Sequence, residues 1–212
     1  LIGSIQERKN QIDAVRALEI SARKDAILNL YGTGAGPYAE ALRRQIEQSP
    51  VRDQVFLRGS VDEATIYENT DVVLATSRSE GMPYVLLEAA AYGKAMLTYD
   101  FDYGPRDIVE DGVNGFLIRA NDVVRLGRKL ADIRVEDAKR LGANGALRFQ
   151  RDFARGAILQ KYAGIIGSNK SKVVADFRKK PSLVSAGAIH VEPRTFLRRR
   201  VGERMTVEVP TE

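Results

Sequence analysis

The chain has 212 residues, of which 44% are hydrophobic, and its 33 basic and 28 acidic side chains give a net charge of +5. With this composition the chain is apolar enough to bury a core, and its length suits one domain with appendages. There is no cysteine, which excludes disulfides and thiol chemistry, and no apolar run approaches the roughly 20 residues of a membrane span.

Short apolar runs alternate with helical stretches in the first 166 residues. The apolar runs predict the tail of a first strand at residues 1–3 and strands at residues 26–31, 55–57, 71–76, 95–99 and 115–118. Helical patterns lie at residues 11–22, 37–48, 62–68, 83–92, 123–133, 135–149 and 154–166. This alternation predicts an α/β fold with a doubly wound parallel sheet.

The segment from Ser79 to Ala89 carries the strongest functional signal. Pro83 is expected at the first helical position and Gly93 at the end of that helix. The backbone N–H groups of residues 81–85 are therefore expected to be unpaired at the carboxyl end of a strand, where α/β sheets bind ligands. Such a terminus favours anions and hydroxyl groups.

Two glutamates flank this turn. Glu80 precedes the helix and can accept hydrogen bonds from sugar hydroxyls, whereas Glu88, two turns later, can hold two neighbouring ribose hydroxyls. The plain alternative is that both are solvated surface residues, as most glutamates are.

At these residues the chain resembles the retaining group 1 glycosyltransferases, which have the two-domain GT-B fold and a Glu-x7-Glu motif in the nucleotide-binding half. The resemblance covers residues 1 to about 166. The matching segments, in the family's order, are 32–34, 55–61, 77–83, 87–93 and 111–117.

The resemblance assigns a role to each matching residue. It implies that Lys9 neutralises the donor diphosphate, that residues 56–60 read the base, that Glu88 holds the ribose, and that Glu80 with residues 81–83 binds the donor sugar. Lys9 and Glu80 are then the catalytic residues. The donor-binding residues are Arg8, Gly32, Phe56, Gly59, Ser60, Ser77, Gly81, Met82, Pro83 and Glu88.

One position departs from the family pattern. The family usually has arginine five residues before the lysine, where this chain has Ser4, and Arg8 stands beside Lys9 instead. Arg8 can supply the missing charge only from a different backbone position. The phosphate clamp is thus the part of the pattern that the sequence supports least.

The resemblance also implies a reaction and partners. It implies a nucleotide-sugar donor, most often UDP-linked, no required metal, and transfer of a hexose with retention to a glycan, wall polymer or protein. A loop at residues 102–109 resembles one in bacterial enzymes that act on wall polymers or adhesins. We expect a preceding acceptor-binding domain that these 212 residues do not supply. A different class, a non-catalytic interaction module on the same fold, stays open.

Residues 168–212 differ in character from residues 1–167, which we assign to the donor-binding domain. Three extended stretches punctuated by prolines predict a small β-rich extension. Its basic triplets, at residues 178–180 and 198–200, favour contact with an anionic membrane surface or a polyanionic acceptor, or form only a solvated face. No nucleic-acid-binding module accompanies the charge. The sequence favours a cytoplasmic location, with the inner face of the membrane as the alternative.

Three other features have alternative interpretations. Residues 32–36 follow a strand as in dinucleotide-binding folds, but Pro37 replaces the third glycine, which argues against hydride transfer. Asp100 and Asp102 form an Asp-x-Asp triplet that could hold a metal ion, although the metal-independent resemblance argues against it. His190 lies in the extension and is expected to be structural or exposed.

Overall fold

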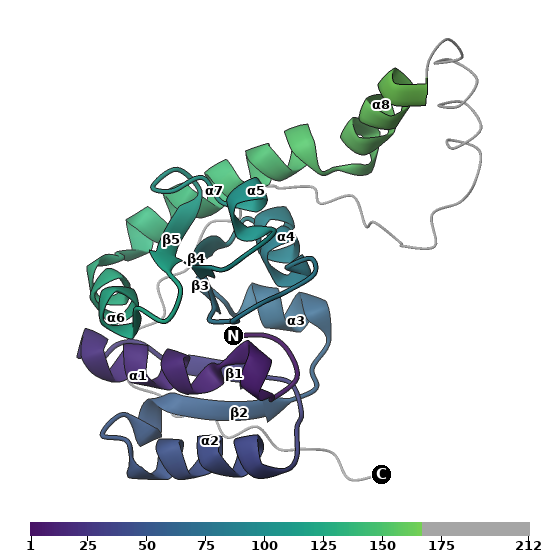
Figure 1. Ribbon diagram of the computed structural model, residues 1–212. Coiled ribbons are helices and arrows are strands. Elements are labelled where there is room, and N and C mark those ends of the chain that lie inside the picture. Colours follow the sequence, from purple (N-terminus) through teal and green to yellow (C-terminus); the bar gives the residue numbers. More distant parts are fainter. Residues whose placement is uncertain (167–212) are drawn as a thin grey trace, which may run out of the picture. The chain divides into compact units, whose positions relative to one another are not determined.

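The structure is a computed structural model, and it describes residues 1–166 (Figure 1). Its strands are β1 (Leu28–Tyr31), β2 (Val55–Gly59), β3 (Val72–Ala75), β4 (Ala95–Asp100) and β5 (Gly115–Arg119). Its α-helices are α1 (Gln11–Ser21), α2 (Pro37–Gln48), α3 (Glu63–Glu68), α4 (Tyr84–Ala91), α5 (Pro105–Ile108), α6 (Val123–Asp132), α7 (Val135–Asp152) and α8 (Arg155–Ile166). Two 3-10 turns, η1 (Glu7–Lys9) and η2 (Arg52–Gln54), complete the described elements.

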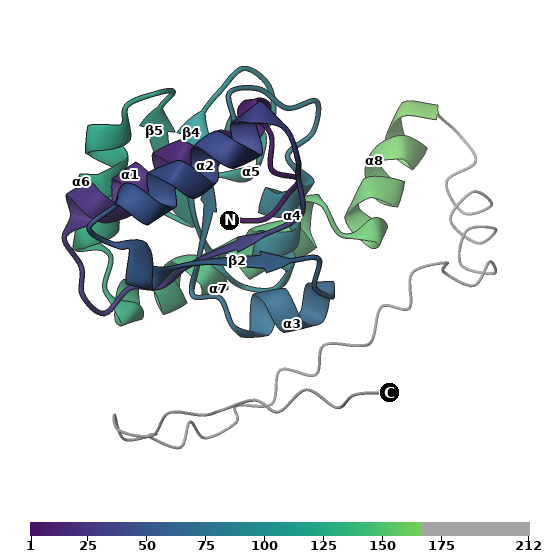
Figure 2. The ribbon, with the colours of Figure 1, turned by 90° about the horizontal axis from the view of Figure 1, so that it is seen from below.

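All strand pairs among the described residues are parallel, as the alternation of strands and helices predicts. β1 pairs with β2, and β4 lies between β3 and β5. β3 and β4 are nearly continuous apolar runs with buried side chains, which is typical of strands covered on both faces. Figure 2 shows α1, α2 and α6 on one side of β2 and α3 on the other. The predicted α/β fold with parallel strands is confirmed.

The strands form two hydrogen-bonded groups, which the sequence did not predict. No ladder joins β1 to β3 in the part of the chain that the structure describes, and a cavity of about 360 Å³ lies between them. The predicted strand tail at residues 1–3 pairs with β1 through a parallel bridge between Ile2 and Tyr31. Residues 1–3 lie along β1, where the amide of Tyr31 donates to the carbonyl of Leu1 and the amide of Gly3 donates to the carbonyl of Tyr31, each at 2.9 Å.

Glycines allow close contact between helices and neighbouring segments. A Cβ on Gly142 of α7 would overlap the backbone carbonyl of Gly93, which follows α4. A Cβ on Gly127 of α6 would lie 2.6 Å from Cβ of Ile20 on α1. These two contacts bring α7 against the end of α4 and α6 against α1, so glycine is required at both positions.

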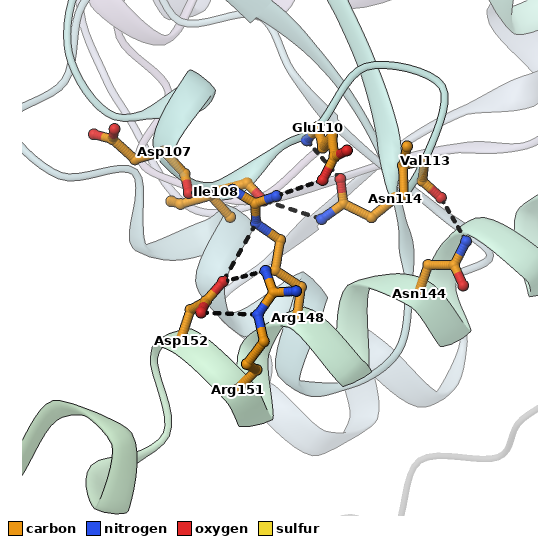
Figure 3. Close-up of polar contacts among 9 residues, drawn as sticks. All are labelled: Asp107, Ile108, Glu110, Val113, Asn114, Asn144, Arg148, Arg151 and Asp152. Atoms are coloured by element: carbon orange, nitrogen blue, oxygen red, sulfur yellow. Dashed lines mark hydrogen bonds and ion pairs between the residues drawn. The ribbon is translucent and has the colours of Figure 1, made fainter. Parts of the chain in front are cut away.

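The segment at residues 111–117, one of those that carry the family resemblance, has a structural role here. Asn114 is buried, donates to the carbonyl of Ile108 at 3.0 Å and accepts from the amide of Glu110 at 2.7 Å. Arg148 of α7 donates to the Glu110 carboxylate at 2.8 Å and to the carbonyl of Asp107 at 3.1 Å (Figure 3). This network fastens the connection between β4 and β5 to α7.

The element boundaries agree with the predictions to within a few residues, with one notable difference at Pro83. This residue is the N-cap of α4, at φ −80° and ψ 71°, and not the first helical residue. The carbonyl of Pro83 accepts a hydrogen bond from the amide of Leu86 at 2.9 Å. The hydrogen bonds of the helix therefore begin one residue later than they would if Pro83 were the first helical residue.

Several predictions lie outside the described residues. These are the β-rich extension, the basic triplets and His190, and the domain boundary at residue 167 stays a prediction. Within residues 1–166, no helix combines the length and the apolar character that crossing a bilayer requires.

Candidate functional site

The N-terminal 3-10 turn η1 is docked on the loop between β3 and α4. The hydroxyl of Thr76 donates to the carbonyl of Lys9 at 3.0 Å, and the amide of Arg78 donates to the carbonyl of Arg8 at 2.8 Å. Asn10, in the left-handed region at φ 50°, then ends the turn and starts α1. These contacts fix the backbone from which both cationic side chains start.

Arg8 and Lys9 are consecutive, and both side chains reach Glu80. Nζ of Lys9 lies 2.7 Å from Oε1 of Glu80, and the guanidinium of Arg8 contacts Oε2. The hydroxyl of Ser77 also donates to Oε1, at 2.7 Å. Four of the predicted site residues are thus brought together around one carboxylate, although the chain separates them into two distant segments.

The Glu80 carboxylate is charged at neutral pH. Its side chain is only 9% exposed, and burial acts to raise its pKa. The hydrogen bonds from Lys9, Ser77 and Arg8 act in the other direction and prevail, so that the pKa of Glu80 lies below its ordinary value. The site therefore holds one anion between two cations.

The two cations differ in their surroundings. The Lys9 side chain is 16% exposed, and its stem lies over Gly3, where an added Cβ would lie 3.1 Å from Cε. The Arg8 side chain is 43% exposed, and its guanidinium also donates to the carbonyl of Ser79 at 2.9 Å. Lys9 is therefore the inner cation and Arg8 the outer one.

The start of α4 differs from the prediction of unpaired amides over residues 81–85. The amide of Tyr84 donates to the carbonyl of Met82 at 2.9 Å, and Pro83 has no N–H to offer. The expectation is therefore wrong for residues 83 and 84. Gly81 and Met82 are exposed, whereas Pro83 is buried because Gly104 packs on its ring so closely that a Cβ there would overlap it.

Glu88 lies on α4, the helix that follows this loop. It has a hydrogen-bond partner that the sequence did not reveal. The hydroxyl of Tyr67, on α3, lies 2.8 Å from Oε2 of Glu88. The Tyr67 ring is stacked on Tyr92, with ring centroids 4.6 Å apart and planes inclined by 12°. Burial first, and then the charge of Glu88, raise the pKa of Tyr67, so its hydroxyl stays protonated and donates.

Gly32 and Gly59 are linked by a backbone hydrogen bond. The amide of Gly32 donates to the carbonyl of Gly59 at 2.6 Å, and a Cβ on Gly32 would overlap the carbonyl of Gly3. The predicted donor-binding glycine thus secures the N-terminal segment that carries Arg8 and Lys9. Gly59 itself is at φ +67°, which favours glycine, and Ser60 beside it is exposed.

Phe56 lies three residues earlier on β2. Its ring is 37% exposed, and the guanidinium of Arg58 lies 4.6 Å from the ring centroid. Arg58 is held by the side chain of Asn29 on β1, whose Oδ1 accepts from Nε at 2.8 Å. The two residues therefore form an exposed aromatic and cationic surface near the end of β2.

The Asp-x-Asp triplet after β4 is already engaged in the fold. Nε of Arg106 donates to the two oxygens of Asp100 at 2.8 and 3.1 Å, and this contact lowers the pKa of Asp100. Phe101 between the two aspartates is buried. Across residues 1–166, no group of three His, Asp or Glu side chains is placed to hold a metal ion.

Sequence reasoning missed Gly3 and Tyr67. Gly3 has no local motif, and its importance comes from the close approach of Lys9 and Gly32. Tyr67 is the last residue but one of α3, 21 residues before Glu88, and no local motif marks it. Only the packing of α3 against α4 brings its hydroxyl to the Glu88 carboxylate.

The chain is similar in sequence to known glycosyltransferases. The family described as "Glycosyl transferases group 1" matches residues 1–148. The chain is 29% identical over 141 residues to the poly(glycerol-phosphate) alpha-glucosyltransferase of Bacillus subtilis (strain 168), an alignment that covers 65% of this chain and 21% of that protein.

Two solved structures share the fold. A TarM mutant of S. aureus in complex with Fondaparinux, alpha-GlcNAc-glycerol and UDP matches with a TM-score of 0.71 at 23% identity, over 79% of this chain and 34% of that one. The C-terminal domain of a group 1 family glycosyl transferase (LpcC) from Francisella tularensis matches with a TM-score of 0.63 at 21% identity, over 72% of this chain and 84% of that one. Because the family match covers most of its length, the chain belongs to the group 1 glycosyltransferases.

Proposed function

We propose that residues 1–167 are the donor-binding half of a retaining glycosyltransferase that transfers a hexose from a UDP-sugar. The observation that carries this proposal is the convergence of Arg8 and Lys9 on Glu80, beside the loop that starts α4. The two cations can bind a phosphate, and the carboxylate beside them can bind the sugar. The bond to be broken joins these two parts of the donor. The acceptor is a glycan, a wall polymer or a protein.

In this proposal the two cations, Lys9 and Arg8, bind the diphosphate. Breaking the bond between the sugar and the nucleoside diphosphate develops negative charge on the leaving phosphate, and fixed positive groups stabilise that charge as it forms. Lys9 is held in place by Thr76 and Gly3, and Arg8 by Arg78 and Ser79, so both can act without large rearrangement. A metal ion is not required for this step because the cations supply the charge.

Glu80 and Glu88 bind hydroxyl groups. When phosphate oxygens take over the contacts to Lys9 and Arg8, the carboxylate of Glu80 becomes available to accept from the donor sugar. Glu88, two turns farther along α4, accepts from the ribose hydroxyls. The UDP in the TarM complex supports a uridine nucleotide as the donor, since that protein shares this fold.

Calorimetric titration of the purified chain tests the proposal. We expect heat with UDP and UDP-sugars, unchanged by EDTA, and much weaker binding by Glu88→Ala. Arg58→Ala, which changes a cation on β2 without touching Glu80 or Glu88, reports on the base-reading segment separately. A folded chain that gives no heat with UDP, UDP-glucose, UDP-N-acetylglucosamine, GDP-mannose or ADP-glucose contradicts the donor site and favours an interaction module.

A further inference from the structure

Tyr67 is fully buried, and its hydroxyl meets a charged group. The side chain comes from α3, and its oxygen lies 2.8 Å from Oε2 of Glu88 on α4. A second acceptor, the carbonyl of Val85, lies at 3.4 Å. The hydroxyl has a single proton, and the nearer, charged acceptor makes the stronger hydrogen bond, so Glu88 receives it.

The position of this hydroxyl is fixed from both sides. The Tyr67 ring is stacked on the ring of Tyr92, which caps the carboxyl end of α4. The side chain of Asp62 caps the start of α3, where it accepts from the amide of Ala64 at 3.0 Å. A buried, stacked ring cannot change rotamer without disturbing α4, and the oxygen therefore stays beside Glu88.

We infer that Tyr67 is a positioning residue for Glu88, which it holds so that the carboxylate presents Oε1 to a vicinal diol. This inference rests on the proposed function, in which Glu88 binds the ribose of the nucleotide. A carboxylate on a helix surface otherwise samples several rotamers, and binding must then fix one of them at a cost in entropy. Because the hydrogen bond to Oε2 fixes that rotamer in advance, it favours a ligand with two neighbouring hydroxyls over a ligand with one.

The inference predicts a change in ligand selectivity. Tyr67→Phe removes only the hydroxyl and keeps the stacked ring. We expect its affinity for UDP to fall roughly three- to tenfold, as for the loss of one hydrogen bond. Its affinity for 2′-deoxy-UDP, which lacks one hydroxyl of the diol, is expected to fall less than about twofold on the same scale.

Calorimetric titration of the full chain with UDP and 2′-deoxy-UDP makes this test. Tyr92→Phe is the matched control, because it removes a hydroxyl from the same ring stack and leaves the bond between Tyr67 and Glu88 in place. We expect this control to bind both nucleotides as the unmodified chain does. In a Glu88→Gln background, Tyr67→Phe is expected to have no further effect on UDP binding, because the two residues act together.

The outcomes separate this inference from the proposed function. If Tyr67→Phe leaves UDP affinity unchanged, or weakens UDP and 2′-deoxy-UDP equally, Tyr67 does not position Glu88 and the inference is overturned, while the donor site stands. If the unmodified, folded chain binds neither nucleotide, both are overturned. Should Tyr67→Phe fail to fold, Glu88→Gln decides: a variant that still prefers UDP to 2′-deoxy-UDP as strongly as the unmodified chain overturns the ribose-binding role of Glu88 and, with it, the inference, whereas UDP binding by that variant leaves the donor site standing.

Discussion

Nζ of Lys9 lies 2.7 Å from Oε1 of Glu80, so these two residues form an ion pair. In the proposed function they bind different parts of one substrate: Lys9 binds the diphosphate and Glu80 binds the sugar. The same carboxylate also receives the guanidinium of Arg8. A phosphate that approaches these cations has to compete with Glu80. We therefore expect the strength of donor binding to depend on how easily the phosphate displaces this carboxylate.

Removing the negative charge of Glu80 is expected to strengthen UDP binding. Glu80→Gln keeps the size of the side chain and removes the competing anion, so we expect UDP to bind about three- to tenfold more tightly. UDP-glucose is expected to gain little over UDP in this variant. Calorimetry measures both affinities. Glu7→Gln, an equal change of charge on η1 whose carboxylate pairs with Arg78 and not with Lys9, serves as the control, and weaker UDP binding by Glu80→Gln contradicts the competition.

The two cations are expected to contribute unequally to UDP binding. Lys9→Ala removes the enclosed cation, and we expect UDP affinity to fall by roughly 10- to 100-fold, as for the loss of a charge-assisted hydrogen bond. Arg8→Ala is expected to cost less, because its half-exposed guanidinium is screened by solvent.

Arg78→Ala is the matched control for this pair. Arg78 lies on the same loop as Glu80, but its guanidinium pairs with Glu7 at 2.9 Å. Titrations at two salt concentrations are expected to show a shallower salt dependence in the Lys9 and Arg8 variants than in Arg78→Ala. A loss of UDP affinity in Arg78→Ala as large as in Lys9→Ala contradicts the assignment.

The stability of the fold is expected to depend on the charge of Glu80 in acid. The pKa of Glu80 is lowered in the folded chain, so its carboxylate stabilises the fold fully above the ordinary pKa of glutamate and loses this contribution as the pH falls through the lowered value. Urea unfolding at pH 7, 5 and 3 measures it. We expect the unmodified chain to exceed Glu80→Gln in stability at pH 7 and the difference to shrink toward pH 3. A difference that stays constant across this range shows that the charge plays no part.

Two glycines of α7 allow the effect of a close contact on stability to be distinguished from the effect of helix propensity. Gly142→Ala forces a methyl group against the carbonyl of Gly93, and we expect it to lower the free energy of unfolding by about 1–3 kcal/mol. Gly145 in the same helix has its nearest neighbour, Cε of Met96, at 3.5 Å, so Gly145→Ala is expected to be neutral or stabilising by up to about 1 kcal/mol. Urea unfolding compares them, and equal destabilisation by both contradicts the contact.

The positions of the helices and strands could be predicted because their signals are local. Pro37 starts α2 and Gly93 follows the end of α4, in line with the conformations that proline and glycine favour. The predicted position of Pro83 is wrong by one residue, because the amide of Tyr84 donates to the carbonyl of Met82 and α4 begins only after the proline. Tyr67 could not be found from local signals, because its hydrogen bond with Glu88 joins two different helices.

The sequence by itself determined the α/β alternation, the family and the residue types available for a donor site. The tertiary structure alone decided which of them meet: Lys9 with Glu80, Glu88 with Tyr67, and Gly32 with Gly3 and Gly59. Turn and helix preferences act over a few residues of backbone, and a sequence pattern therefore records them directly. A contact between residues 71 positions apart exists only after the loop between β3 and α4 has packed on η1, and its hydrogen bonds depend on the final positions of both segments.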